Sequence, residues 1–381
     1  MVNVRIQGRA VLFLCSFLVG LFILTGCMSE RELGRHSVLL HNKEIIKEAI
    51  PPSFTGQDLI LPIQIEEGQF NSVSGWLNND KIIYTTNVGL GSNIYTYNIF
   101  NGENQLIFES DAPVSSITVS PSGNQLLIHS VPTTYGGIIT IIDDNGNEIM
   151  SERIEAFDFV IEWNPYDENI LLLSLFSEDW DFSTQRLNLA DKSMVSIELE
   201  EPFIQWKSAD EVIYLDWDQQ QPSLLAPLMK KPLTKGGEQV VFDEIYYMKA
   251  IKNYIMTITI PSDKINESVY TFLSNDFNEV ASFTFPHLTR YSDWLIPYFD
   301  FTENHQIFTL APLYYSEFDT YGEGFQLLSL NIDKGEETVI LDDLGNEPIS
   351  CSPNGANCLY GFYLEKLINI NTKEMTEIVK E

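Results

Sequence analysis

The sequence predicts an all-β fold, a β-propeller of four-stranded antiparallel blades, and three observations support this prediction. A pattern of two short apolar segments around a tight turn recurs about every 43 residues. The turns hold Pro, Asn, Asp and Gly, which tight hairpins require. No helical period of useful length appears after residue 60.

Four regular copies define the repeat. Trp76, Val119, Trp163 and Trp206 occupy matching positions, at intervals of 43, 44 and 43 residues. Three looser copies follow, with hairpins expected over the segments 245–260, 294–310 and 348–363.

Each hairpin is followed by two more strand-like segments, as 94–97 and 105–108 show in the first copy. Four strands in about 40 to 45 residues are typical of a propeller blade. Seven copies favour seven blades over residues 58–381, and a degenerate fourth or fifth copy would leave six. We expect Leu59 to Ile65 to add a closing strand to the last blade.

The N-terminus predicts export. Arg5 and Arg9 precede an apolar run from Ala10 to Leu24. As a helix this run would span about 22 Å, too short for the hydrocarbon core of a membrane. Residues 1–26 are therefore expected to form a secretory signal peptide.

Cys27 is the predicted lipidation site. Leu24, Thr25 and Gly26 precede it, as small residues precede the cysteine of a bacterial lipobox, and two acyl chains anchor a protein stably. Residues 27–57 then form a tether, and the protein lies on the extracytoplasmic face of the cell membrane. The alternative is an uncleaved signal anchor. A Gram-positive surface and an outer membrane both remain open.

Two cysteines remain for the folded part. Cys15 leaves with the signal, whereas Cys351 and Cys358 flank a turn and could face each other across a hairpin. An exported protein meets an oxidising environment, so a disulfide is possible. The alternative is that both are small buried apolar residues.

The charge excludes nucleic acid as a partner. The chain has 22 basic and 54 acidic residues, a net charge of −32. Loss of residues 1–26 removes Arg5 and Arg9 and no acid, which leaves −34. Nucleic-acid binding needs clustered Lys and Arg, and anionic lipids would repel this chain, so its link to the membrane is the lipid.

One end of the propeller is the candidate ligand-binding face. Strands alternate in direction, so the longer loops gather on one face, with exposed aromatic and acidic residues that suit a peptide, sugar or cationic group. The alternative is that the two tryptophans pack between blades and the aspartates cap turns. The candidate residues are Tyr135, Asp179, Trp180, Asp181, Asp216, Trp217, Asp218, Tyr314, Tyr315, Asp319 and Tyr321.

Signals for catalysis are weak. The sequence has no Gly-x-Ser-x-Gly elbow, no His-Glu-x-x-His motif and no paired Cys spacing for zinc. We therefore expect no catalytic residue, metal or cofactor. The sequence favours a binding or scaffold protein of the envelope with a protein, peptide or carbohydrate partner. The alternative is a carbohydrate-active hydrolase or lyase that uses carboxylates of the long-loop face.

Two turns carry a family resemblance. Residues 119–126 and 351–355 resemble the Ser-Pro-Asp-Gly turn of TolB-type and WD40-type propeller repeats, although Ser122 and Asn354 replace its aspartate. The Gly-His and Trp-Asp marks of true WD40 blades are missing. With the lipobox, the whole chain resembles the YqgU-like propeller lipoproteins of Gram-positive bacilli. This resemblance implies six blades, against the seven counted from the repeats, and implies no particular activity.

Overall fold

The strands follow one another in groups of four. The computed structural model describes residues 58–380 except 134, 135, 219, 222, 235 and 292. The expected signal peptide, Cys27 and the tether lie outside these residues. The chain divides into two compact units, residues 1–49 and 50–381, and the described residues belong to the second. They form seven four-stranded sheets, with strands paired antiparallel in chain order, which confirms a propeller of four-stranded antiparallel blades.

Sheets 1 to 4 cover residues 69–245 and are numbered in chain order. Sheet 1 holds β1 (Gln69–Trp76), β2 (Lys81–Val88), β3 (Gly91–Asn98) and β4 (Asn104–Ser110). Sheet 2 holds β5 (Val114–Val119), β6 (Gln125–Ser130), β7 (Gly137–Asp143) and β8 (Glu148–Ile154). Sheet 3 holds β9 (Asp158–Trp163), β10 (Ile170–Phe176), β11 (Phe182–Asn188) and β12 (Ser193–Ile197). Sheet 4 holds β13 (Gln205–Trp206), β14 (Glu211–Leu215), β15 (Ala226–Pro232) and β16 (Gln239–Ile245).

Sheets 5 to 7 complete the series. Sheet 5 holds β17 (Tyr247–Ile251), β18 (Tyr254–Thr259), β19 (Glu267–Ser274) and β20 (Glu279–Pro286). Sheet 6 holds β23 (Phe299–Phe301), β24 (Gln306–Ala311), β26 (Phe325–Asn331) and β27 (Glu336–Leu344). Sheet 7 holds β28 (Ile349–Cys351), β29 (Asn357–Tyr360), β30 (Lys366–Asn369) and β31 (Met375–Glu377).

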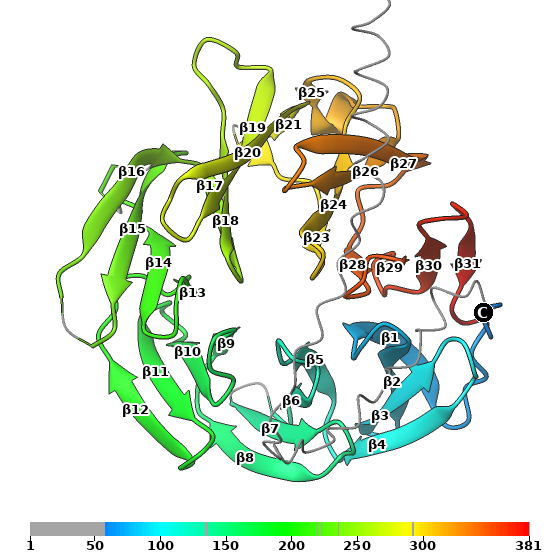
Figure 1. Cartoon of the computed structure of the whole chain (residues 1–381). Coiled ribbons are helices and arrows are strands. Elements are labelled where there is room, and N and C mark those ends of the chain that lie inside the picture. The colour runs from blue at the N-terminus through cyan, green and yellow to red at the C-terminus, as the bar shows by residue number, and fades with distance from the viewer. Residues whose placement is uncertain are drawn as a thin grey trace, which may run out of the picture. The chain divides into compact units, whose positions relative to one another are not determined.

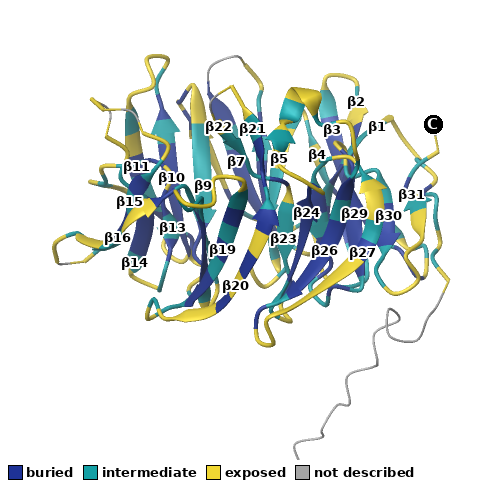
Figure 2. Cartoon of the chain, turned by 90° about the horizontal axis from the view of Figure 1, so that it is seen from above, coloured by how far each residue is buried: buried dark blue, intermediate teal, exposed yellow. Residues whose placement is uncertain are grey.

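The sheets stand around a common centre, with first strands such as β5, β9 and β13 on the inner side (Figure 1). The second strand of a sheet is buried on both faces, because a neighbouring sheet covers each face. For this reason β10 reads as an almost unbroken apolar run, whereas the outer strand β12 is largely exposed. Buried residues accordingly lie in the inner parts of the sheets, and exposed ones lie in the loops on both faces and on outer strands such as β27 (Figure 2).

Each pair of consecutive sheets shares one hydrophobic cluster. The described residues contain seven such clusters, and six of them join sheets that follow each other in the chain. The seventh joins sheet 7 back to sheet 1. A sheet of four strands cannot bury both of its faces alone, so this circular packing is what makes every sheet stable.

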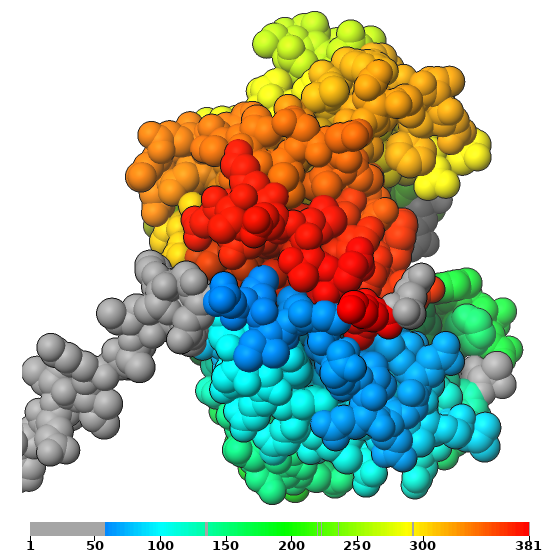
Figure 3. Space-filling view, turned by 90° about the vertical axis from the view of Figure 1, so that its right-hand side faces the viewer, coloured from blue at the N-terminus to red at the C-terminus, as the bar shows by residue number. Residues whose placement is uncertain are grey.

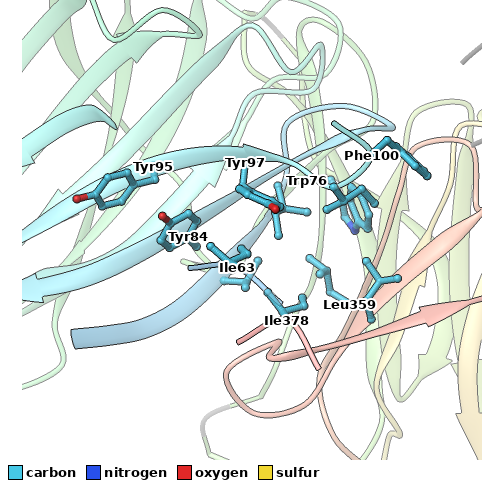
Figure 4. Close-up of a cluster of buried hydrophobic side chains, with 12 residues drawn as sticks. Ile63, Trp76, Tyr84, Tyr95, Tyr97, Phe100, Leu359 and Ile378 are labelled. Carbon is cyan, nitrogen blue, oxygen red and sulfur yellow. The ribbon is translucent and has the colours of Figure 1, made fainter. Parts of the chain in front are cut away.

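The closing cluster brings together residues from the two ends of the unit. Trp76 and Tyr84 of sheet 1 pack with Leu359 and with Ile378, which follows β31 (Figure 4). In the space-filling view the first and last parts of the unit lie directly against each other (Figure 3). The indole N–H of Trp76 donates to the backbone carbonyl of Ser350 at 2.9 Å, so a polar contact reinforces the apolar one.

The segment before β1 joins this closure, but not as the expected strand. The backbone N–H of Ile60 donates to the carbonyl of Ile99, and that of Ile63 donates to the carbonyl of Ile378, both at 2.7 Å. A single parallel bridge pairs Ile63 with Val379. The predicted addition of Leu59 to Ile65 to the last blade is therefore confirmed only at Ile63, as a single bridge and not as a strand, because the segment crosses the junction and bonds to both sheets.

A small three-stranded sheet was not predicted; two of its strands lie between sheets 5 and 6 in the chain, and the third lies in the loop between β24 and β26. It consists of β21 (Leu288–Arg290), β22 (Asp293–Leu295) and β25 (Ser316–Glu317), and β25 leads into the short 3-10 helix η1 (Phe318–Thr320). The sixth hairpin was expected to start at Trp294, whereas β23 begins at Phe299. Trp294 pairs with Thr289 in the small sheet instead.

The repeated Ser-Pro turns have a common hydrogen-bonding role. The hydroxyl of Ser120 accepts the backbone N–H of Gln125 at 3.1 Å, and that of Ser352 accepts the N–H of Asn357 at 3.2 Å. Both serines are buried. Each hydroxyl thus closes its own β-hairpin and satisfies a backbone donor that would otherwise be buried unpaired.

Two structural features require a glycine at position 123, in the first of these turns. Its φ of +74° lies in the left-handed region. A Cβ added there would stand 2.3 Å from the carbonyl oxygen of Leu77 in the turn of sheet 1. The turn of sheet 2 therefore packs so closely against the backbone of sheet 1 that no side chain fits between them.

A disulfide links Cys351 to Cys358 across the last hairpin. The two residues are directly paired in β28 and β29, with Cα atoms 3.9 Å apart, and both side chains are buried. Their side chains also belong to the cluster between sheets 6 and 7. The bond therefore fixes the inner hairpin of the sheet that closes the ring.

Gly123→Ala should destabilise the protein more than Gly335→Ala. Gly335 has a φ of +65° but nothing within 4 Å of an added Cβ, so its substitution adds only backbone strain, about 1 kcal/mol. At Gly123 the clash with Leu77 adds about 2 kcal/mol. Urea unfolding of the two variants measures the difference, and equal losses would contradict the close approach.

Removal of the disulfide should lower the free energy of unfolding by about 2 kcal/mol, because the cross-link restricts the unfolded chain over a short loop. Urea titrations of wild type and of the Cys351→Ala, Cys358→Ala double variant, each with and without reductant, check this. Reductant should lower the stability of the wild type and leave the variant unchanged. A wild type indifferent to reductant would show that the bond contributes nothing.

Candidate binding surface

Antiparallel order divides the connections of the propeller between two faces. The turns after the first and third strands of each sheet lie on one face. The loops after the second strands, and the connections from one sheet to the next, lie on the other, which we call the long-loop face. Its longest loops within a sheet are 216–225, between β14 and β15, and 312–324, between β24 and β26.

An exposed group of aromatic rings occupies the long-loop face at sheet 3 and at its connections to sheets 2 and 4. The ring centroid of Trp180 lies 5.8 Å from that of Phe176 and 6.1 Å from that of Phe157. Phe176 also contacts Phe203, at 6.0 Å. Trp180 and Phe203 are each 62% exposed and Phe157 is 47% exposed. These four residues form the aromatic patch.

The turn that carries Trp180 holds the indole on the surface. The backbone N–H of Ser177 donates to the carbonyl of Asp181 at 2.8 Å, and that of Trp180 donates to the carbonyl of Ser177 at 3.1 Å. Trp180 has a φ of +65°, which is uncommon for a bulky residue. The strained conformation is maintained by these two hydrogen bonds, and it leaves the ring largely in solvent.

The patch is surrounded by carboxylates. Asp179 and Asp181 flank Trp180 and are exposed. Glu155 and Glu200, on the neighbouring connections, and Asp158, at the start of β9, are also exposed. The segments 155–158, 177–181, 198–204 and 216–218 contain no Lys, Arg or His. Apolar rings inside an uncompensated negative field favour a partner that is both apolar and cationic.

Sequence reasoning found Trp180 and missed Phe157 and Phe203 as members of the patch. Phe157 lies in the connection between sheets 2 and 3, and Phe203 lies in the connection between sheets 3 and 4. The available signal was a single ring in an acidic stretch, as in Glu200-Glu201-Pro202-Phe203. Both residues belong to the face predicted for binding.

The second Asp-Trp-Asp triplet differs from the first. Trp217 is 36% exposed, and no ring contact joins it to another aromatic residue among those described. Asp216 is partly exposed, and the backbone N–H of Trp217 interacts with the carboxylate of Glu201, whose pKa is raised by burial. The carboxylate of Asp218 accepts the backbone N–H groups of Gln220 and Gln221 at 2.8 and 3.1 Å. Asp218 therefore caps a turn, as the alternative interpretation of the triplets expected.

The predicted tyrosines lie in a separate group beside the small sheet. Tyr321 packs on Tyr314 at 5.1 Å, and its hydroxyl donates to the carbonyl of Gly324 and accepts the N–H of Leu313, both at 2.9 Å. These bonds give Tyr321 a structural role in its own loop. Tyr315 contacts His287 at 5.1 Å, and burial lowers the pKa of that histidine.

Of the other predicted residues, Asp319 is exposed in η1 and Tyr135 lies outside the described residues. The structure thus places all the described candidates on the long-loop face, but in separate groups. In the described part of the chain, no cluster of three or more His, Cys, Asp or Glu side chains could hold a metal ion. No helix among the same residues has the length and apolar character needed to cross a membrane.

Comparison with known families agrees with the ring of sheets. The family described as the YqgU-like 6-bladed beta propeller domain matches residues 98–361. The chain belongs to this YqgU-like family. Uncharacterized lipoprotein YqgU of Bacillus subtilis (strain 168) is 23% identical over 321 residues, which cover 84% of this chain and 87% of that protein.

Solved structures similar to this YqgU-like chain share its fold. Uncharacterized protein lmo1340 of Listeria monocytogenes EGD-e has a TM-score of 0.78 at 22% identity, over 85% of this chain and 98% of that one. The β-propeller domain of the Trilobed protease from Pyrococcus furiosus, described with an open velcro topology, has a TM-score of 0.54 at 12% identity, over 82% and 98%.

The number of blades in the family description differs from the number of four-stranded sheets in this YqgU-like chain. The description gives six blades, whereas the described residues form seven four-stranded sheets. The matched range begins at Asn98, the last residue of β3, and ends at Gly361, directly after β29. It therefore contains sheets 2 to 6 whole and only parts of sheets 1 and 7.

Proposed function

We propose that this protein is a lipid-anchored binding protein of the cell envelope, and that its aromatic patch takes a basic, partly apolar segment of another envelope protein. The observation that carries this proposal is the exposure of Trp180, Phe157 and Phe203 on an otherwise acidic face. Trp180 contacts Phe157, and both Trp180 and Phe203 contact the buried Phe176. Soluble proteins rarely leave such rings together in water without a partner.

The chemistry of the patch supports a protein segment as ligand. Trp and Phe rings contribute most to binding when a partner covers them, and a Lys or Arg over an indole gains about 0.5 to 2 kcal/mol. The carboxylates around the patch attract the same cations and increase the rate of encounter. Because Phe176 is buried beneath Trp180 and Phe203, the rings need little reorganisation on binding.

The lipid anchor rests on the N-terminal sequence. A short apolar run ends directly at Leu24-Thr25-Gly26-Cys27, and a relative that covers most of the chain is named a lipoprotein. An anchor at residue 27 leaves about thirty residues before the first described residue, a tether long enough to hold the propeller clear of an anionic membrane surface.

Seven blades are part of the same proposal. Seven sheets of equal strand number, and seven hydrophobic clusters that link them in a circle, support a ring in which each sheet serves as one blade. In a ring of this kind the aromatic patch would lie over the third blade and its connections to the second and fourth blades.

Cys27→Ala should abolish acylation and release the protein from the membrane fraction. Cell fractionation and mass spectrometry of the N-terminal peptide measure both effects, with Cys15→Ala as a control that keeps the acyl group. An unmodified wild-type peptide that still contains residues before Cys27 would instead indicate an uncleaved signal anchor.

The Trp180→Ala, Phe203→Ala double variant should bind a basic apolar peptide at least tenfold more weakly than wild type. The probe is a fluorescent peptide of Lys, Leu and Trp, compared by anisotropy with a counterpart in which Glu replaces Lys. Wild type should bind the first and not the second, and added salt should weaken binding because the carboxylates contribute.

Phe362→Ala is the matched control, since Phe362 is 67% exposed on the same face, in the loop between β29 and β30. It should bind the basic peptide like wild type. Equal binding of both peptides, or no loss in the double variant, would contradict the proposal. Binding of cell-wall polysaccharide without peptide binding would favour a carbohydrate ligand.

A further inference from the structure

A polar groove lies between sheets 6 and 7, on the face opposite the long-loop face. It has a volume of about 540 Å³, which is within the range of ligand pockets, about 300 to 1,000 Å³. Sheet 6 forms one wall, and two turns of sheet 7 form the other. The two sheets lie side by side at the surface of the ring (Figure 3). The polar groove is therefore separate from the aromatic patch, which lies on the other face.

The wall from sheet 6 carries its polar groups in register. Phe308 pairs with Ser329, and Ser329 pairs with Thr338, across β24, β26 and β27. Paired residues project to the same side of a sheet, as do residues two apart on one strand, so Gln306 joins this row. An amide, an aromatic ring and two hydroxyls therefore line the groove from one side.

The wall from sheet 7 consists of the turn 354–356, between β28 and β29, and the turn 370–373, between β30 and β31. The backbone N–H of Ile370 donates to the carbonyl of Ala356 at 3.0 Å. This bond joins the two turns into a single wall.

A glycine keeps the space between the two walls open. Gly355 has a φ of +70°, in the left-handed region. A Cβ added there would stand 3.1 Å from Oε1 of Gln306 and 3.2 Å from a ring carbon of Phe308. A side chain at this position would therefore project onto the opposite wall.

Hydrogen bonds between the two sheets fix both ends of the groove. Near the first strands, the side-chain amide of Asn304 donates to the carbonyl of Asn354 at 3.0 Å. At the outer strand β27, the ammonium group of Lys373 donates to the carbonyl of Val339 at 3.3 Å. The groove is thus formed before any ligand arrives, which lowers the cost of binding.

Four polar side chains in the groove have no partner in the protein. Among the described residues, no hydrogen bond is made by the side chains of Gln306, Ser329, Thr338 and Asn371. Other polar side chains of the same turns are engaged, since Ser352 accepts the N–H of Asn357 and Asn369 accepts that of Asn371. Ser329 is only 9% exposed, and hydroxyls in such surroundings are normally paired. The groove therefore presents hydrogen-bonding groups that the fold does not use.

The charge of the groove differs from that of the chain. None of its described lining residues is Asp or Glu, although the chain has 54 acidic residues. Lys373 is the one charged residue in this lining, and an ammonium group has three donors, of which Val339 takes one. The groove therefore suits a ligand that has several hydroxyls and an acidic group.

We propose that the polar groove binds a sugar unit with one acidic group, a uronic acid or a sugar phosphate. The sugar hydroxyls bond to the unpaired amides and hydroxyls of the two walls, and the carboxylate or phosphate lies at Lys373. Amides and hydroxyls offer both donors and acceptors, as sugar hydroxyls require. Phe308, Ile340 and Ile370 add a small apolar surface for the C–H groups of the sugar ring. This site does not depend on the proposed function.

Two other uses of the groove fit its chemistry less well. Hydrolysis of a glycosidic bond uses a pair of carboxylates, and none is present in the described lining. A nucleotide needs an exposed ring on which its base stacks, whereas Phe308 is only 1% exposed. The groove therefore favours binding of a sugar without turnover.

Isothermal titration calorimetry of the full chain, in micelles of a detergent without a sugar head group, tests the proposal. The probes are glucuronic acid, galacturonic acid and glucose 6-phosphate, compared with glucose, galactose, acetate and inorganic phosphate. An acidic sugar should bind about tenfold or more tightly than its neutral counterpart and than the simple anions. The uronic acids and the sugar phosphate then distinguish the two sources of the acidic group. No heat for any acidic sugar at about 10 mM, or equal binding of neutral sugars or simple anions, overturns the proposal.

Substitution of Lys373 tests the position of the acidic group. Lys373→Met should bind the acidic sugar no more tightly than its neutral counterpart, whereas Lys373→Arg, which keeps the charge, should retain most of the affinity. Lys334→Met is the matched control, because Lys334 is exposed in the corresponding turn of sheet 6 and does not line the groove. Equal affinity of Lys373→Met and wild type overturns the proposal.

Substitution of Ser329 separates binding from folding. Because its hydroxyl has no partner in the protein, Ser329→Ala should keep the melting temperature of wild type and bind the sugar about fivefold more weakly. Unchanged affinity, or a marked loss of stability, overturns the role given to this hydroxyl.

The Trp180→Ala, Phe203→Ala double variant locates the sugar on the correct face. It should bind the acidic sugar like wild type, because the aromatic patch lies on the long-loop face. Loss of sugar binding in this variant would place the sugar at the aromatic patch and overturn the proposal.

Discussion

Packing of each sheet against both of its neighbours is the constraint on which this molecule depends. A sheet of four short strands has two apolar faces, and only a circular arrangement covers all of them. The second strand of a sheet shows the result most clearly, since β10 is buried almost throughout while β12, at the outer edge, is mostly exposed. The same constraint explains why Gly123 is needed where one turn meets the next sheet.

The parts of the fold that could be predicted from the sequence are those that recur in each sheet because of this packing. Trp76, Trp163 and Trp206 are buried at equivalent places, and the spacing between them follows from one sheet per repeat. Trp294 misled the prediction because the small sheet inserts strands between β20 and β23, and a local apolar pattern cannot tell an insertion from a repeat. The closing segment was misjudged for a related reason, since its two backbone bonds go to different sheets.

The candidate sites were less accessible to sequence reasoning. Loop position indicated the correct face for Trp180, but its contact with Phe157 and the contact of Phe203 with Phe176 join separate segments of the chain and leave no periodic signal. On the opposite face many polar side chains form hydrogen bonds that close turns, as Ser120 and Ser352 do. Their hydrogen-bonding groups are therefore less available to ligands.

The way the ring closes also determines how it carries mechanical load. Ile60 bonds to sheet 1 and Ile63 bonds to sheet 7, so the chain enters the domain across its seam. In an anchored protein, tension between membrane and partner would reach this crossing first. The two hydrogen bonds and the side chains around Ile63 would resist it before any complete sheet was stretched. Tension on the N-terminal segment would thus act first on the seam. The force at which the seam opens would limit the force that reaches the remaining sheets.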